Sequence, residues 1–188
     1  MNDTVQQFYY GKIKDESSLE NDVDSFWLNL LPEYFQKKLK YGISFEERPL
    51  PQSTKAADWT VRYIIKSGSK KVIFMGNPCK DINGQTALWM IALDQVTRYM
   101  SLVRAESDQS ATETLYGAVN IGTYTRFYQL DPYKQECADY PGTNGECYEL
   151  AENEAEIHAI LQDLVHKTSN GVNYTPATSR ESVGVCDI

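Results

Sequence analysis

The chain has 188 residues, of which 41% are apolar and 23% charged, and it carries a formal net charge of −8. This length and composition are typical of one globular domain whose core is large enough to fold without disulfide or metal crosslinks. The acidic balance argues against a dedicated nucleic-acid-binding protein, whose phosphate contacts need lysine and arginine, but it does not exclude a local basic cleft. The lysines form two clusters, which indicate either solvated surfaces or such a cleft: Lys37, Lys38 and Lys40, and then Lys66, Lys70 and Lys71.

The sequence shows no targeting feature, and we expect a protein of the cytoplasm or nucleus that makes no membrane contact. Its start is polar, without the apolar segment of a secretory signal, and no stretch approaches the roughly 18 apolar residues of a membrane span. None of the four cysteines belongs to a CxxC pair, so a zinc site is not expected. Cys137 and Cys147 flank two turns and could form a disulfide, but free thiols are the expected state inside a cell.

The first elements along the chain are an arm and a helix. Residues 1–22 are polar and acidic, and we expect a flexible arm. A helix is predicted from Asp24, where Asp24 or Ser25 can cap it, because phenylalanine and leucine then recur at helical spacing. Pro32 is expected to perturb this helix and Gly42 to end it.

Two strands and a second helix follow. Residues 58–65 alternate and are rich in β-branched and aromatic side chains, which predicts a strand. After a turn at 67–69, residues 71–75 form a continuous apolar run, which predicts a strand in the centre of a sheet. The clearest helix is predicted over 86–104, where the apolar residues fall on one stripe.

The last part of the chain predicts a strand pair, or one long bent hairpin, and a third helix. The pair covers 116–122 and 123–130, a turn-rich loop follows over 131–148, and the helix covers 149–167. The segment 169–188 is polar and is expected to be a flexible tail.

The order of these elements predicts the fold class. Helix, strands, helix, strands and helix make an α/β (α+β) domain over 23–168, in which a mixed central sheet is flanked by helices. No nucleotide-binding, zinc-protease or serine-hydrolase motif is present. His158 and His166 are eight residues apart, too far for a metal pair on one helix turn, and we expect both on the surface.

One arrangement of polar residues stands out. Asp58 opens the first predicted strand, and Lys80 follows the end of the second. The next helix carries Gln95 and Tyr99, four residues apart and therefore on one side of the helix. A glycine-containing strand over 116–122 and an aromatic strand come next.

This arrangement resembles the PD-(D/E)xK nuclease-like superfamily, in the form found in many fungal proteins. The resemblance covers about residues 25–130 and implies a restriction-endonuclease-like core. In that family a strand aspartate and a second carboxylate share one Mg²⁺, which polarises the scissile phosphate and lowers the pKa of a bound water. The motif lysine stabilises the developing charge, and an acid of the first helix assists the metal.

The resemblance implies a role for each matching residue. Asp58 corresponds to the first metal ligand, Lys80 to the motif lysine, and Gln95 with Tyr99 to the pattern of the following helix. Glu33 is the best candidate for the first-helix acid. Mg²⁺ would be the cofactor of an active enzyme.

Each of these residues also has a plain structural interpretation. Asp58 could cap a strand or turn, Lys80 could belong to a solvated turn, and Glu33 could favour a helix start. Gln95 lies on the apolar stripe, so we expect it to face the core, where an amide needs partners, and Tyr99 is expected in the core. The three tryptophans are also expected there: Trp27, Trp59 and Trp89.

The central motif is broken at one position. The second carboxylate should lie two residues before Lys80, where the sequence has Pro78, which has no side-chain oxygen to bind a metal. A carboxylate elsewhere could replace it, and the candidates are Asp81, Asp94 and Glu47.

Three interpretations of the function follow. The first is a nuclease-like domain that is inactive or weak and binds a protein partner or nucleic acid, with self-association as a further possibility. The second is an active Mg²⁺-dependent nuclease with a relocated carboxylate. The third is an unrelated α/β binding domain with the same order of elements.

Overall fold

The structure is a computed structural model that describes residues 3–15, 17–48, 57–65, 68–77, 86–106 and 112–169. The helices are α1 (Thr4–Lys14), α2 (Glu20–Tyr34), α3 (Thr86–Glu106) and α5 (Glu154–Thr168), with a short 3-10 helix η1 (Lys37–Leu39). The strands are β1 (Tyr41–Glu47), β2 (Ala57–Ile65), β3 (Gly68–Asn77), β4 (Leu115–Ile121), β5 (Tyr124–Leu130), β6 (Ala138–Asp139) and β7 (Tyr148–Glu149).

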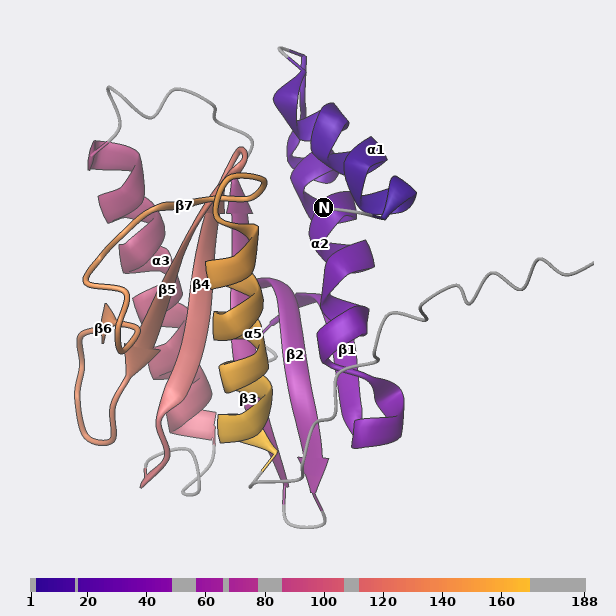
Figure 1. Ribbon diagram of the computed structural model, residues 1–188. Helices are drawn as coiled ribbons and strands as arrows, with labels where there is room; N and C mark the ends of the chain where they lie inside the picture. The colour runs from indigo at the N-terminus through magenta and orange to yellow at the C-terminus, as the bar shows by residue number, and fades with distance from the viewer. Residues whose placement is uncertain are drawn as a thin grey trace, which may run out of the picture.

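The strands form one mixed sheet in the order β1-β2-β3-β4-β5-β6, and β7 also pairs with β5. Strands β3 and β4 are parallel, and α3 connects them as parallel strands require, whereas the other pairs are antiparallel. Helix α3 covers one face of the sheet, and α2 and α5 cover the other (Figure 1). The predicted fold class, a mixed sheet flanked by helices, is therefore confirmed.

The core has two layers because successive residues of a strand point to opposite faces of the sheet. In β3, Ile73 packs in the layer of α3, and the next residue, Phe74, packs in the layer of α2 and α5. Trp27 and Trp59 are 0% exposed and Trp89 is 5% exposed, which confirms that the tryptophans belong to the core.

The N-terminal segment is not the flexible arm that we expected for residues 1–22. Asp3 caps α1, because its side chain accepts hydrogen bonds from the backbone N–H groups of Val5 (2.7 Å) and Gln6 (3.2 Å). Ile13 at the other end of α1 is fully buried, so the core holds this helix against α2. Of the expected tail over 169–188, residues 170–188 lie outside the described part of the chain.

Helix α2 begins earlier than predicted. Its first turn is fixed by Asp22, whose carboxylate accepts a hydrogen bond of 2.8 Å from the backbone N–H of Leu19, so Asp24 does not cap the helix. Pro32 lies inside the helix, which ends two residues later at Tyr34. The left-handed residue after η1 is Lys40, with a φ of 69°, and Gly42 belongs to β1.

Gly117 of β4 allows α3 to pack closely on the sheet. A Cβ atom at this position would lie 2.3 Å from the Cε atom of Met100 and 3.1 Å from the carbonyl oxygen of Ile73. We expect Gly117→Ala to lower the free energy of unfolding by about 1–2 kcal/mol, because the helix must move or Met100 must leave its rotamer. Urea denaturation measures this change.

The control for this prediction is Gly11→Ala in α1. A Cβ atom at Gly11 would have no neighbour within 4 Å, so alanine should stabilise the helix by about 0.5–1 kcal/mol. A Gly117→Ala variant as stable as the wild type would contradict the close packing of α3.

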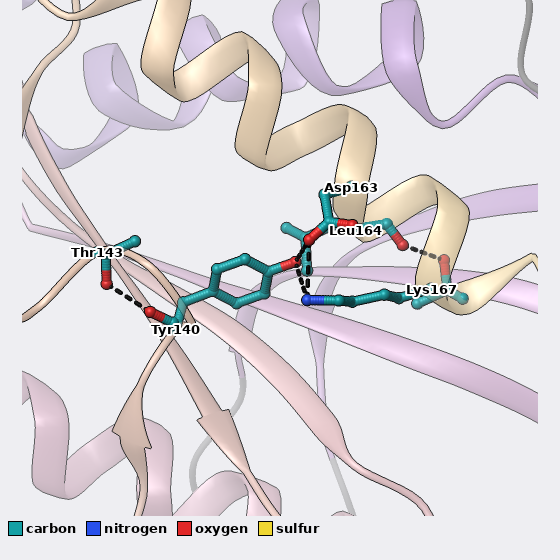
Figure 2. Close-up of polar contacts among 6 residues, drawn as sticks. Tyr140, Thr143, Asp163, Leu164 and Lys167 are labelled. Carbon is teal, nitrogen blue, oxygen red and sulfur yellow. Dashed lines mark hydrogen bonds and ion pairs between the residues drawn. The ribbon is translucent and has the colours of Figure 1, made fainter.

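A polar cluster ties α5 to the loop between β6 and β7 (Figure 2). The Tyr140 hydroxyl donates a hydrogen bond of 2.6 Å to Oδ2 of Asp163, and Lys167 Nζ lies 2.8 Å from the same oxygen. Lys167 also donates to the Tyr140 hydroxyl at 3.0 Å and lies 4.3 Å from the centre of its ring. Burial alone would raise the pKa of Asp163, but the bonds from Lys167 and Tyr140 outweigh it and hold the pKa below its usual value.

We expect Tyr140→Phe to lower the free energy of unfolding by about 1 kcal/mol. The change removes the hydrogen bond to the charged carboxylate of Asp163 and the one that the hydroxyl accepts from Lys167. Asp163 and Lys167 are both partly exposed and can regain part of these bonds from water. Tyr133→Phe is the matched control, since Tyr133 is 79% exposed and should show no change. Equal stability of the two variants in thermal denaturation would show that the cluster does not stabilise the fold.

Candidate functional site

Asp58 lies where the pairing of β2 with β3 stops. The paired residues end at Trp59 and Phe74, although both strands continue beyond that point. There the Oδ2 atom of Asp58 accepts a hydrogen bond from the backbone N–H of Gly76. The carboxylate thus provides this amide of β3 with an acceptor beyond the end of the ladder.

Asp24 of α2 also lies next to Gly76. A Cβ atom at Gly76 would lie 3.3 Å from Oδ1 of Asp24 and 3.4 Å from Cη2 of Trp59, so the glycine leaves room for the carboxylate. This Oδ1 atom is buried and has no hydrogen-bond partner among the described residues. Asp24 and Trp59 also line a hollow of about 350 Å³ beside Phe45.

The two carboxylates have raised pKa values. Burial, and next the charges of Asp58, Glu20 and Glu46, raise the pKa of Asp24 to about 7. Burial raises the pKa of Asp58 to about 6, against the effect of the Gly76 N–H, and the charges of Glu20 and Glu46 add to the rise. Both carboxylates therefore titrate closer to neutral pH than an ordinary aspartate does.

The pair meets the needs of Mg²⁺ in part. Mg²⁺ prefers oxygen ligands and keeps several waters, so two carboxylates are enough for a single ion. The unpartnered Oδ1 of Asp24 suits this role, whereas Oδ2 of Asp58 is already engaged with Gly76. Among the residues that the structure describes, no group of three or more His, Cys, Asp or Glu side chains could hold a metal ion.

Glu33, the predicted acid of the first helix, is not part of this site. It is exposed and accepts a hydrogen bond of 2.9 Å from Nε2 of Gln6. Nine residues separate it from Asp24, which is about 13 Å along a helix axis. The acid that α2 brings to Asp58 is Asp24, with Glu20 one turn before it on the same side of the helix.

The other predicted residues are mostly separate from Asp58. Gln95 is exposed, so the prediction that it faces the core is wrong, whereas Tyr99 is buried as expected and its hydroxyl lies 3.4 Å from Oγ1 of Thr60. Asp94, a candidate for the relocated carboxylate, is exposed and forms an ion pair of 3.0 Å with Arg98. Three further positions lie outside the described residues: Pro78, Lys80 and Asp81. The side chain of Glu47 is not described either.

The remaining predictions concern residues away from the pair. Cys137 and Cys147 are free thiols, as expected. His158 and His166 are exposed, also as expected, and Nδ1 of His158 lies 2.9 Å from the hydroxyl of Tyr34. No helix in the described ranges has both the length and the apolar character needed to cross a bilayer.

The fold and the site together define an α/β domain with two protonatable carboxylates at the point where two central strands part. Comparisons with protein-family models, with curated proteins and with solved structures found no match.

Proposed function

We propose that the chain is a PD-(D/E)xK nuclease-like domain that does not cleave nucleic acid efficiently and acts by binding a protein partner or nucleic acid. The observation that carries this proposal is the state of Asp58. Its carboxylate is bound to the Gly76 amide, and the described residues offer no third metal-binding side chain beside it and Asp24.

The order of elements supports the nuclease-like part of the proposal. The acidic helix α2 comes first, and after β1 the chain runs through β2, with Asp58 as its second residue, then β3 and α3, which is the order that the resemblance implies. The glycine-containing strand β4 and the aromatic strand β5 then complete the sheet.

The chemistry of phosphodiester cleavage supports the loss of efficient activity. A metal must neutralise the phosphate and activate a water, which requires more than one well-placed oxygen ligand. Continuing the register of β2 and β3 places Met75 opposite Asp58, and Gly76 follows it. Neither Met75 nor Gly76 has a side-chain oxygen. Pro78, at the motif position, has none either.

One observation favours a second candidate function, an active Mg²⁺-dependent nuclease with a relocated carboxylate. Asp24 is a carboxylate beside Asp58, although it comes from α2 and was not among the sequence candidates. If a metal binds, Asp24 and Asp58 would hold it, and the metal would supply charge neutralisation at the phosphate.

Calorimetric titration with Mn²⁺ separates the two candidates, because Mn²⁺ accepts the same oxygen ligands as Mg²⁺. Our proposal predicts binding weaker than about 1 mM in the wild type, Asp58→Ala and Asp24→Ala alike. Tighter binding that both substitutions abolish, and that the exposed control Asp94→Ala retains, would favour the active nuclease.

Cleavage itself is tested with supercoiled plasmid and Mg²⁺. We expect no nicking above that of Asp58→Ala. Robust Mg²⁺-dependent nicking by the wild type that disappears in Asp58→Ala would overturn the proposal.

A further inference from the structure

An apolar groove of about 990 Å³ lies between the end of α2 and the strand β1. Its apolar lining comes from Pro32 and Phe35 of the α2 end, Tyr41 and Ile43 of β1, and Ile64 of β2. Ile64 is 55% exposed, so part of the groove is open apolar surface.

The strand beside this groove is an edge of the sheet. Within the described ranges, β1 pairs with β2 alone (Figure 1). The backbone N–H of Ile64 donates to the carbonyl of Lys40 at 2.9 Å, and this bond sets which residues of β1 point their backbone groups toward β2. By this alternation, the N–H and C=O groups of Ile43 and Phe45 point away from β2, and no described strand pairs with them.

The charge around β1 is polarised along the strand. Lys37, Lys38 and Lys40 are exposed at its start, and none of them forms an ion pair with a described residue. The opposite end of β1 is acidic. Glu46 lies there, and its charge raises the pKa of Asp58. This polarity selects an occupant that is acidic at the lysine end and uncharged or basic at the other.

A second copy of the chain fits this groove poorly. Each copy carries a net charge of −8, so two copies repel at long range. An acidic segment on a different protein matches the lysines without requiring two acidic bodies to approach face to face.

We propose that the groove receives an extended peptide of a partner protein, which adds to β1 as a further strand. Ile43 and Ile64 lie on opposite faces of the sheet, so apolar side chains on one face of the peptide meet Ile43 and those on its other face meet Ile64. The acidic residues of the peptide meet Lys37 and Lys40. The proposal rests on a function in partner binding, but it does not depend on Asp24 or Asp58.

The test is selection from a displayed library of random twelve-residue peptides. We expect enrichment of peptides that alternate β-branched residues and carry two or more acidic residues at one end. In ¹⁵N-labelled protein, a selected peptide should slow hydrogen exchange of the outward-facing amides of Ile43 and Phe45 by at least about tenfold.

Charge-reversed variants test the role of the lysines. Lys37→Glu combined with Lys40→Glu should weaken binding of the selected peptides by about tenfold, as two exposed charge contacts would. The matched control combines Lys12→Glu with Lys134→Glu, which are exposed lysines outside the groove, and should bind as the wild type. Asp58→Ala should also bind normally, which separates this proposal from the nuclease-like site.

Three outcomes would overturn the proposal. One is a selection without acidic enrichment, and another is binding that leaves the amides of Ile43 and Phe45 unprotected. The third is a dimer in sedimentation equilibrium whose Ile43 and Phe45 amides are already protected without peptide, since a second copy would then fill the groove.

Discussion

Replacing Asp24 or Asp58 by asparagine is expected to stabilise the protein at pH 8 and to leave its stability unchanged near pH 3. The free energy of unfolding should rise by about 2 kcal/mol for Asp58→Asn and by about 1–2 kcal/mol for Asp24→Asn, which is partly exposed and therefore screened by solvent. Asparagine keeps an oxygen that can accept the hydrogen bond from the Gly76 amide.

The sign follows from the raised pKa values. Both groups have an unfolded pKa near 3.8, whereas the folded values are about 7 for Asp24 and about 6 for Asp58. Between these values the folded protein binds more protons than the unfolded chain, so the stability of the wild type falls as the pH rises from about 4 to 7. Asparagine stays neutral, so the variants keep the stability that the wild type loses as the pH rises. Below pH 3.8 the wild-type carboxylates are protonated, and the variants gain nothing.

Urea denaturation of the wild type and both variants at pH 3, 5 and 8 measures this prediction. The exposed pair of Asp94 with Arg98 provides the control, since Asp94→Asn should change stability by less than about 0.5 kcal/mol at every pH. Variants that are less stable than the wild type at pH 8 would show that the two carboxylates stabilise the fold as anions.

Glu149→Ala is expected to lower the free energy of unfolding by about 3 kcal/mol, the largest effect of a single side chain predicted here. Glu149 is 7% exposed, and its carboxylate accepts hydrogen bonds from the Tyr10 hydroxyl (2.7 Å) and from the backbone N–H groups of Ala151 (2.7 Å) and Glu152 (2.9 Å). Alanine leaves these donors without their acceptor and releases α1 from β7.

The pH dependence of this contribution is opposite to that of the aspartate pair. Burial alone would raise the pKa of Glu149, but the bonds from Tyr10 and the two backbone groups outweigh it and hold the pKa below 4.5. The stabilisation is therefore present above pH 4.5 and is lost as the pH falls through the lower folded pKa.

A double-mutant cycle with Tyr10→Phe isolates the bond between α1 and β7. Glu149→Gln is the conservative control, because one amide oxygen can still accept a hydrogen bond and the loss should be smaller than for alanine. A Glu149→Ala variant within about 0.5 kcal/mol of the wild type would contradict the role of this carboxylate as an anchor.

The strands could be predicted from the sequence because their apolar patterns are strong. The residues of β2, β3, β4 and β5 alternate or form apolar runs, and the stripe of α3 has the period of a helix. Helix α1 was missed because it buries few apolar side chains, and its contacts with distant residues, such as Glu149, leave no local pattern. Its one local signal was the capping residue Asp3.

The candidate site was harder to predict than the strands. Asp58 could be identified because it lies at the start of a strand, as its second residue. The position of its neighbour Asp24 depends on how α2 crosses the sheet, which no sequence spacing records. Gln95 was misplaced by a single residue. Its neighbour Val96 is 0% exposed, and one residue turns a helix by about 100°, which carries Gln95 out to solvent.

The single parallel pairing of the sheet also bears on how the chain folds. Strands β1, β2 and β3 follow one another as antiparallel neighbours, and β4 and β5 form a second antiparallel pair, so each group assembles from contacts close in sequence. Among the described strands, the β3–β4 pairing alone joins the two groups, and the chain must close a long loop through α3 to form it. Folding slows as contacts become less local, so we expect the β3–β4 pairing and the docking of α3 to limit the folding rate.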